Sequence, residues 1–163
     1  MSGRDFNITL IPLWEQERPL VLRLGHALHE RLPEAEPPVT MHGRELLPER
    51  EGVGFQFQYT LNGDLYRGAR RAAYYVVQAQ LIRRKTSLAW QVDAMPVLEE
   101  ADGRYDLYAK RPYSVAFHDR VSLQDLFVNR LADDAQTFFA AVRAGTPPAE
   151  RPTSSGGQPL PTG

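Results

Sequence analysis

In four runs between residues 53 and 117 the hydrophobic side chains recur at every second position, and this spacing constrains the fold more than any other feature of the chain. The clearest run is 53–61, where aromatic and aliphatic residues alternate with glycine, glutamine and threonine. A period of two places the apolar side chains of a strand on one face of a sheet. The runs therefore predict an antiparallel meander of four long strands, at 53–61, 64–82, 88–98 and 105–117.

The Asp-Gly dipeptide at residues 102–103 predicts the turn between the last two strands. Pairing across this turn places Leu98 opposite Leu107 and Trp90 opposite Val115, so that apolar residues face each other along the ladder. The same pairing places the following residue, Tyr108, on the opposite, more polar face.

Residues 72–82, read alone, fit either a helix or a strand. A turn directly after them places Leu81 opposite Leu88 and Gln78 opposite Gln91, which matches apolar to apolar and polar to polar. A slip of one residue would mix the two faces, so the agreement favours a strand.

The first two strands pair less simply. Asn62-Gly63 is a preferred dipeptide of tight hairpins, but simple pairing across it places Phe55 opposite Arg70 and mixes the faces. A bulge at Gly68 would restore the pattern, so we expect a bulged hairpin.

Helical periodicity appears on both sides of the meander. The segment from Ser122 to Gly145 has one apolar face, begins with a capping pattern of Ser122 and Asp125, and predicts a long core-facing helix. Residues 19–32 predict a shorter helix with Pro19 in its first turn. A strand at 6–14 is expected before it, and a further edge strand at 39–46.

These elements predict the α+β class, with an antiparallel meander packed against a long C-terminal helix and a shorter N-terminal helix. The element order is similar to that of helix-grip ligand-binding domains, and this likeness implies no particular ligand. We expect one domain over residues 1–145. Proline, serine and glycine dominate 146–163, which is typical of a disordered tail.

Composition excludes several functions. The chain of 163 residues has no cysteine, which removes disulfides, thiolate metal sites and thiol nucleophiles. The formal charge of -1 gives no general attraction to nucleic acid or to acidic membranes. The sequence starts without a signal-peptide pattern and contains no membrane-length apolar run, so we expect a cytoplasmic location and no membrane partner.

No familiar catalytic or cofactor motif is present, so we expect no cofactor and lean away from an enzyme. The chain lacks a phosphate-binding loop, a dinucleotide fingerprint and a serine nucleophile elbow. His26 and His29 stand three apart on the predicted helix, but their order with Glu30 fits no zinc hydrolase signature and no third ligand is evident. We therefore predict no metal site.

The most unusual feature is the sheet face turned away from the long helix. Neutral polar side chains dominate it, with Asp93 and Lys110 as the charged residues near its centre, whereas a solvated face normally carries more charge. Either the N-terminal elements cover this face or it binds a partner. The residues expected to bind that partner are Gln56, Gln58, Gln78, Gln80, Gln91, Tyr74 and Tyr108.

Two hypotheses for function follow. The first is a non-catalytic binding or assembly domain that recognises a protein partner, a second copy of itself or an apolar small ligand. The alternative is an accessory protein that binds single-stranded nucleic acid, because arginine binds phosphates and tyrosine stacks on bases. The basic residues for this alternative form two clusters: Arg67, Arg70 and Arg71, and Arg83, Arg84 and Lys85.

Overall fold

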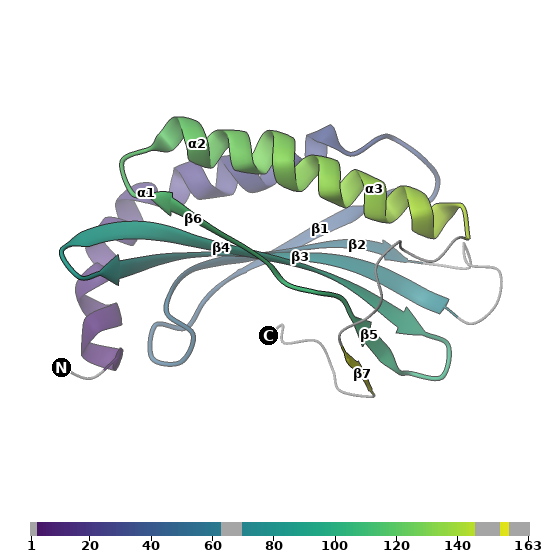
Figure 1. Cartoon of the computed structure of the whole chain (residues 1–163), viewed down its shortest axis with the longest axis horizontal. Coiled ribbons are helices and arrows are strands. Elements are labelled where there is room, and N and C mark those ends of the chain that lie inside the picture. Colours follow the sequence, from purple (N-terminus) through teal and green to yellow (C-terminus); the bar gives the residue numbers. More distant parts are fainter. Residues whose placement is uncertain (1–2, 63–69, 146–153, 157–163) are drawn as a thin grey trace.

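The computed structural model describes residues 3–62, 70–145 and 154–156 (Figure 1). Along the chain, one helical segment precedes a run of antiparallel strands and another follows it, which confirms the predicted α+β class. The elements in chain order are α1 (Gly3–Arg31), β1 (Thr40–Glu45), β2 (Val53–Asn62), β3 (Arg70–Arg84), β4 (Ser87–Glu100), β5 (Tyr105–Leu107), β6 (Arg111–Ala116), α2 (Arg120–Asp125), the π-helix η1 (Leu126–Leu131), α3 (Ala132–Arg143) and β7 (Ser154–Gly156).

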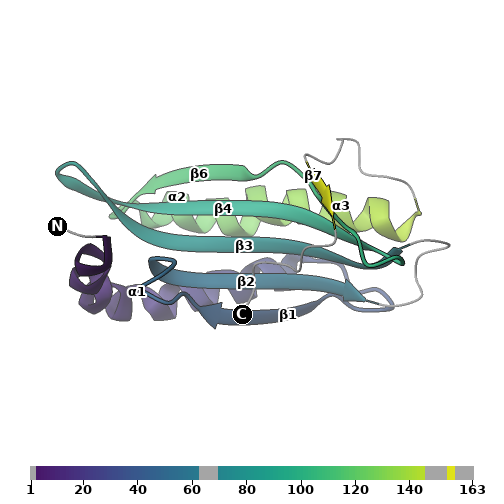
Figure 2. The same ribbon diagram turned by 90° about the horizontal axis from the view of Figure 1, so that it is seen from below.

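The strands form one antiparallel sheet in the order β1-β2-β3-β4. Both β5 and β6 pair with β4, along successive parts of its length, and β7 pairs with β5. Figure 1 shows the C-terminal helical segment and the later part of α1 on one side of this sheet, with the first turns of α1 beyond its end, and Figure 2, seen from below, shows the strands in front of α2 and α3. The meander is therefore confirmed, with β1 as the expected additional edge strand.

The hydrophobic core lies between the helices and the sheet. Trp90 of β4 is 1% exposed and meets Trp14 of α1 edge to face, with 6.3 Å between the ring centroids. Phe57 of β2 meets Phe127 of η1 in the same manner at 6.2 Å. Aromatic side chains from the helices and from the sheet thus meet at the centre of the core.

The predicted strand at 6–14 is wrong, because these residues belong to the 29-residue helix α1. Pro12 and Pro19 both lie within this helix, on its exposed side. Buried residues recur every three to four positions from Leu10 to Leu28, which is a helical period. The helix-grip-like element order therefore does not hold at the N-terminus.

The register between β3 and β4 differs from the prediction by two residues. Leu81 lies opposite Trp90 rather than Leu88, because the turn is centred one residue later and Lys85 adopts a φ of 48° within it. An even shift keeps every side chain on its predicted face. The expected pairing of Gln78 with Gln91 is wrong for the same reason, and Gln78 lies opposite Asp93.

The predicted strand 105–117 is two strands with different registers. Trp90 lies opposite Val115 as predicted. Near the turn, however, Leu107 lies opposite Val97 rather than Leu98, a shift of one residue that the break between β5 and β6 absorbs.

No tight hairpin at Asn62-Gly63 joins the first two strands. Phe55 pairs with Ala79 and Asn62 with Ala72, so the whole segment 63–71 separates the paired residues. The bulge expected at Gly68 falls outside the described residues. The first irregularity of the described β3 lies instead at residues 70–72.

The C-terminal helix begins earlier than predicted. Asp119, rather than Ser122, caps it by accepting a hydrogen bond from the Ser122 backbone N–H at 3.0 Å. Its end before Gly145, whose φ is 72°, agrees with the prediction.

The π-helix η1 follows from the spacing of the buried side chains in the C-terminal helix. Five of the nine buried hydrophobic side chains recur every four residues, at Leu123, Phe127, Leu131, Ala135 and Phe139. In an α-helix each such step turns the apolar face by about 40°. The wider π turn in the middle of the series reduces that drift and keeps the five residues on the core.

The segment predicted as a disordered tail contributes one short strand. Ser154–Gly156 (β7) pairs antiparallel with Tyr105–Leu107 (β5). The other residues of that segment, 146–153 and 157–163, lie outside the described residues.

Candidate functional site: the open face of the sheet

The sheet face opposite the helices, here called the open face, has no described helix over it (Figure 2). Strand alternation assigns its residues, because their neighbours Phe57, Tyr75 and Trp90 lie in the core. The central residues of the open face are Gln56, Gln58, Thr60, Tyr74, Val76, Gln78, Gln80, Gln91, Asp93, Met95 and Val97. The expectation that α1 covers this face is wrong, since α1 packs beside the C-terminal helix.

Six of the seven residues predicted for the site lie on the open face, and Tyr108 does not. Tyr108 is buried in the core, where its ring meets Phe138 of α3 at 6.4 Å between centroids. Its backbone N–H bonds the Pro96 carbonyl, in line with the shifted register of β5. A shift of one residue reverses the face on which a side chain lies, and this explains the error.

Polar groups along β4 are joined by hydrogen bonds. Arg84 donates to the Gln91 Oε1 atom at 3.0 Å, and the Gln91 Nε2 atom donates to Asp93 at 3.1 Å. Tyr74 of β3 donates its hydroxyl to Glu99 at 2.7 Å. The β4 side of the open face is therefore ordered by internal contacts.

Gln56 of β2 is 3% exposed, yet its Nε2 donor has no hydrogen-bond partner in the structure. The hydroxyl of Thr60, four residues along the same strand and also buried, lacks one too. Buried polar groups in proteins are nearly always hydrogen-bonded, so two unsatisfied groups on one face require an explanation.

Arg44 of β1 borders the open face directly opposite Gln56. Its guanidinium donates to both carboxylate oxygens of Glu51, at 2.9 and 2.7 Å. This bidentate pair, with a further bond from the Leu47 N–H, lowers the pKa of Glu51 to about 2. The sequence analysis missed Arg44, because no turn dipeptide before β2 indicates how residues 39–46 pair with it.

The five described basic residues of the alternative site are split between the two ends of β3. One group, at the turn into β4, consists of Arg83, Arg84 and Lys85. The other, at the start of the strand, includes Arg70 and Arg71, whereas Arg67 falls outside the described residues. The strand is 15 residues long, and residues at 3.3 Å each place its ends roughly 50 Å apart. The two groups do not form one continuous surface.

Arg83 lines a cavity of about 330 Å³ at the end of the sheet, together with Arg50 from the β1–β2 connection. Gln80 also lines it, and its side-chain amide donates to the Glu51 carbonyl. This hydrogen bond connects Gln80 of β3 to the β1–β2 connection.

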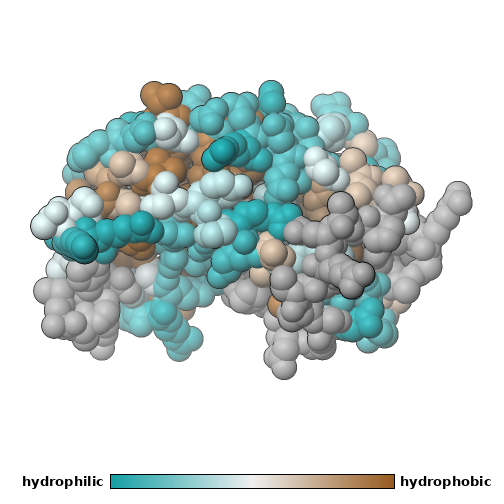
Figure 3. All heavy atoms as spheres, in the orientation of Figure 1, coloured by the Kyte–Doolittle hydropathy of each residue, from teal (hydrophilic) through white to brown (hydrophobic). Residues whose placement is uncertain are grey.

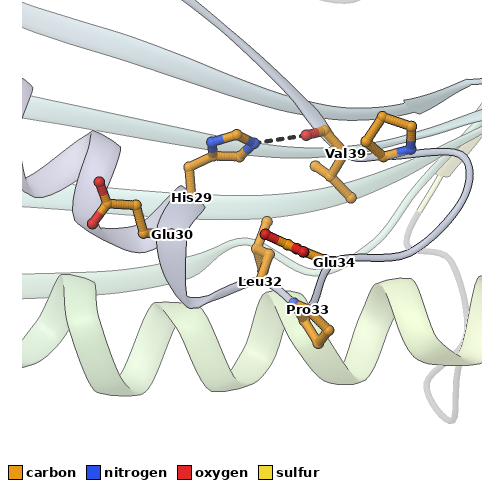
Figure 4. Close-up of a pocket in the computed structure, with 7 residues that line it drawn as sticks. His29, Glu30, Leu32, Pro33, Glu34 and Val39 are labelled. Atoms are coloured by element: carbon orange, nitrogen blue, oxygen red, sulfur yellow. Dashed lines mark hydrogen bonds between the residues drawn. The ribbon is translucent and has the colours of Figure 1, made fainter.

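A second cavity, of about 310 Å³, lies beside the connection from α1 to β1 (Figure 4). His29 points across it and donates from Nε2 to the Val39 carbonyl at 2.6 Å, and its ring stacks on Tyr59. These contacts fix the end of α1 to the start of β1. His26, three residues earlier on the helix, is exposed.

Exposed apolar side chains do not mark a separate docking surface. Figure 3 shows a mostly hydrophilic side with hydrophobic residues near α2. Val121 of α2 is 80% exposed and Leu47 of the β1–β2 connection 49%. Single residues of this kind are ordinary on protein surfaces.

Among the described residues, no three histidine, aspartate or glutamate side chains converge as a metal site would require. No helix in the described ranges is both long enough and apolar enough to cross a membrane.

No family model, curated protein or solved structure matches this chain. The argument for function therefore rests on the residues of the open face.

Proposed function

We propose that the protein is an assembly domain that pairs with a second copy of itself through the open face. The observation that carries this proposal is the buried Nε2 donor of Gln56, which has no acceptor. A buried donor without a partner costs about 1–3 kcal/mol.

The chemistry of the face supports a second copy as that partner. A twofold dimer presents the same patch from both subunits, so the patch must complement itself. Gln56 and Gln78 lie opposite each other at the centre of the face, and each carboxamide offers both a donor and acceptors. Such groups can pair with copies of themselves, whereas a patch with charges of one sign would repel its copy.

Strands β1 to β4 at about 4.8 Å spacing, over ten residues at about 3.3 Å, span roughly 600 Å². The surface that a partner can cover is smaller than this, because Gln56, Thr60, Val76 and Val97 are each at most 6% exposed within one chain. Twisted sheets stack face to face in β-sandwiches, about 10 Å apart.

The oligomeric mass of the full chain tests the proposal. We expect sedimentation equilibrium to give twice the monomer mass of 18.4 kDa. Gln58→Lys buries an ammonium group over the apolar Val76 of the open face and should yield a monomer with unchanged circular dichroism. Thr137→Lys adds the same charge on the exposed side of α3 and should leave the dimer intact.

A wild-type chain that remains monomeric at millimolar concentration would overturn the proposal. A dimer that Gln58→Lys leaves intact would do so too, because the contact would then lie elsewhere.

A further inference from the structure

The centre of the open face is shielded from solvent, although no described helix lies over it. None of its central residues is exposed, and Thr60, Val76 and Val97 are 4%, 6% and 0% exposed. On the outer side of α3, by contrast, Asp133 and Thr137 are exposed. Side chains stand roughly perpendicular to a sheet, so their neighbours in the sheet shield their sides more than their tips. Burial of these tips requires a further layer of atoms above the sheet.

One row of paired residues connects this shielded centre to the edge of the sheet where β7 lies. Thr60 of β2 pairs with Tyr74 of β3, and Tyr74 pairs with Val97 of β4. Val97 pairs with Leu107 of β5, which pairs with Ser154 of β7. The row takes four steps of about 4.8 Å, so β2 lies roughly 19 Å from β7.

We propose that residues 157–163, which follow β7 directly, cross the open face and supply the further layer. Seven residues extend to at most about 25 Å, which is enough to reach β2 from β7. The segment carries no charged side chain, and this suits a face on which an unpaired charge would be buried. The segment would also compete with a second copy of the chain for the open face, and this part alone rests on the proposed function.

The composition of the segment fits the face in a second respect. Pro159 and Pro161 favour an extended conformation and have no backbone N–H that burial would leave unpaired. Proline-rich segments of this kind bind surfaces that present aromatic rings. Tyr74 presents such a ring, held by the hydrogen bond from its hydroxyl to Glu99 at 2.7 Å.

Leu160 is the apolar side chain of the segment. It lies four residues after the end of β7, and an extended chain at about 3.1 Å per residue brings it roughly 12 Å from that strand. Along the row this distance falls between β4 and β3. We therefore expect Leu160 to contact the pair formed by Tyr74 and Val97.

The connection from β2 to β3, residues 63–69, fits this role less well. A connection of this length fixed at both ends reaches outward by about half its extended length, or roughly 12 Å. Val76 lies four residues beyond Ala72, where the pairing of β2 with β3 ends, and this places it about 13 Å away. The connection also contains Asp64 and Arg67, which the low-charge face does not match.

Disulfide trapping tests the contact directly, because the chain has no cysteine of its own. In dilute protein with oxidised glutathione, Leu160→Cys/Val97→Cys should close an intramolecular disulfide at least about tenfold faster than Leu160→Cys/Thr137→Cys, since docking raises the effective concentration of the two thiols. Thr137 is exposed on α3, on the other side of the sheet, and serves as the matched control. Mass spectrometry of the intact monomer measures both rates.

Equal rates in the two double variants would overturn the proposed contact. Faster closure of Leu65→Cys/Val97→Cys than of Leu160→Cys/Val97→Cys would overturn it too, because residues 63–69 would then cover the face.

The competition with a second copy is tested in the full-length chain. Leu160→Glu places a charge in the docked segment, so it should release the segment and lower the dissociation constant of the dimer at least about fivefold. Thr137→Glu adds the same charge on α3 and should leave that constant unchanged. Sedimentation equilibrium measures both variants.

The two experiments fail separately. Rapid trapping in a chain that stays monomeric, with or without Leu160→Glu, would overturn the proposed function and the competition but leave the segment on the open face. A dimer whose segment is not trapped would leave the proposed function and overturn this inference. A dimer that Leu160→Glu does not strengthen would overturn the competition alone.

Discussion

At the scale of the residue, the contact between α1 and β2 depends on the absence of a side chain at Gly25. A methyl group there would come within 2.1 Å of the Phe57 ring. The helix lies so close to the sheet at this point that the Tyr59 hydroxyl donates to the Gly25 carbonyl at 2.6 Å. Glycine is costly within a helix, by about 1 kcal/mol relative to alanine, and here the close approach accounts for it.

Gly25→Ala is therefore expected to destabilise the protein by about 1–3 kcal/mol, despite the gain in helix propensity, because the Phe57 ring is enclosed by the core. Urea denaturation measures the change. Phe57→Leu in the same chain removes the clash, so the double variant should lose less than the sum of the two single changes. A Gly25→Ala protein as stable as the wild type would show that the ring has room to move.

At the scale of the element, an ion pair ties α1 to the C-terminal helix. Glu17 is 7% exposed and occupies an otherwise apolar stripe of α1. Arg120, the first residue of α2, donates to it at 2.6 Å. The pair joins residues 103 positions apart in the sequence, and a buried carboxylate without such a partner would be strongly unfavourable.

Arg120→Ala should destabilise the protein by about 1–3 kcal/mol, since it leaves the Glu17 carboxylate buried and unpaired. Glu17→Leu removes the carboxylate and its need for a partner together, and extends the apolar stripe. It should therefore cost less than Arg120→Ala in chemical denaturation. The reverse order would mean that the arginine contributes little and that the carboxylate has other essential contacts.

At the scale of the whole molecule, two buried tyrosines govern stability at high pH. Burial raises the pKa of Tyr59 well above its usual range. Burial, together with the Asp134 carboxylate that accepts a hydrogen bond from its hydroxyl at 2.7 Å, does the same for the pKa of Tyr75. The folded protein holds both protons, whereas the unfolded chain releases them near pH 10.

The contribution of these two tyrosines to stability should accordingly be constant at neutral pH and fall above pH 10, because the unfolded state then binds fewer protons than the folded state. Each tyrosine contributes a slope of up to about 1.4 kcal/mol per pH unit. Urea denaturation at pH 9, 10 and 11 measures the slope. The double variant Tyr59→Phe/Tyr75→Phe should show a much smaller fall in the free energy of unfolding above pH 10. A fall equal to that of the wild type would assign the effect to other groups.

The sequence by itself determined the features that depend on local periodicity. Alternation over residues 53–61 identified one strand, and the match of residues 72–82 to the strand that follows them identified a second, with the side chains of both sorted correctly between the two faces. The sorting held even where the predicted register was wrong, because an even shift between β3 and β4 preserves the face of every residue. The long C-terminal helix followed from its own apolar period, and six of the seven residues predicted for the site lie on one face for the same reason.

Only the tertiary structure decided the features that depend on contacts between distant segments. Residues 6–14 are helical because Leu10 and Trp14 pack in the core, which no local pattern indicated against two prolines. Tyr108 changed faces through a single odd shift at the break in the last strand. The placement of Arg44 and Asp93 on one rung arises from three successive strand pairings. Periodicity is a property of one segment and can be read from it, whereas register and burial are settled jointly by all the segments that pack together.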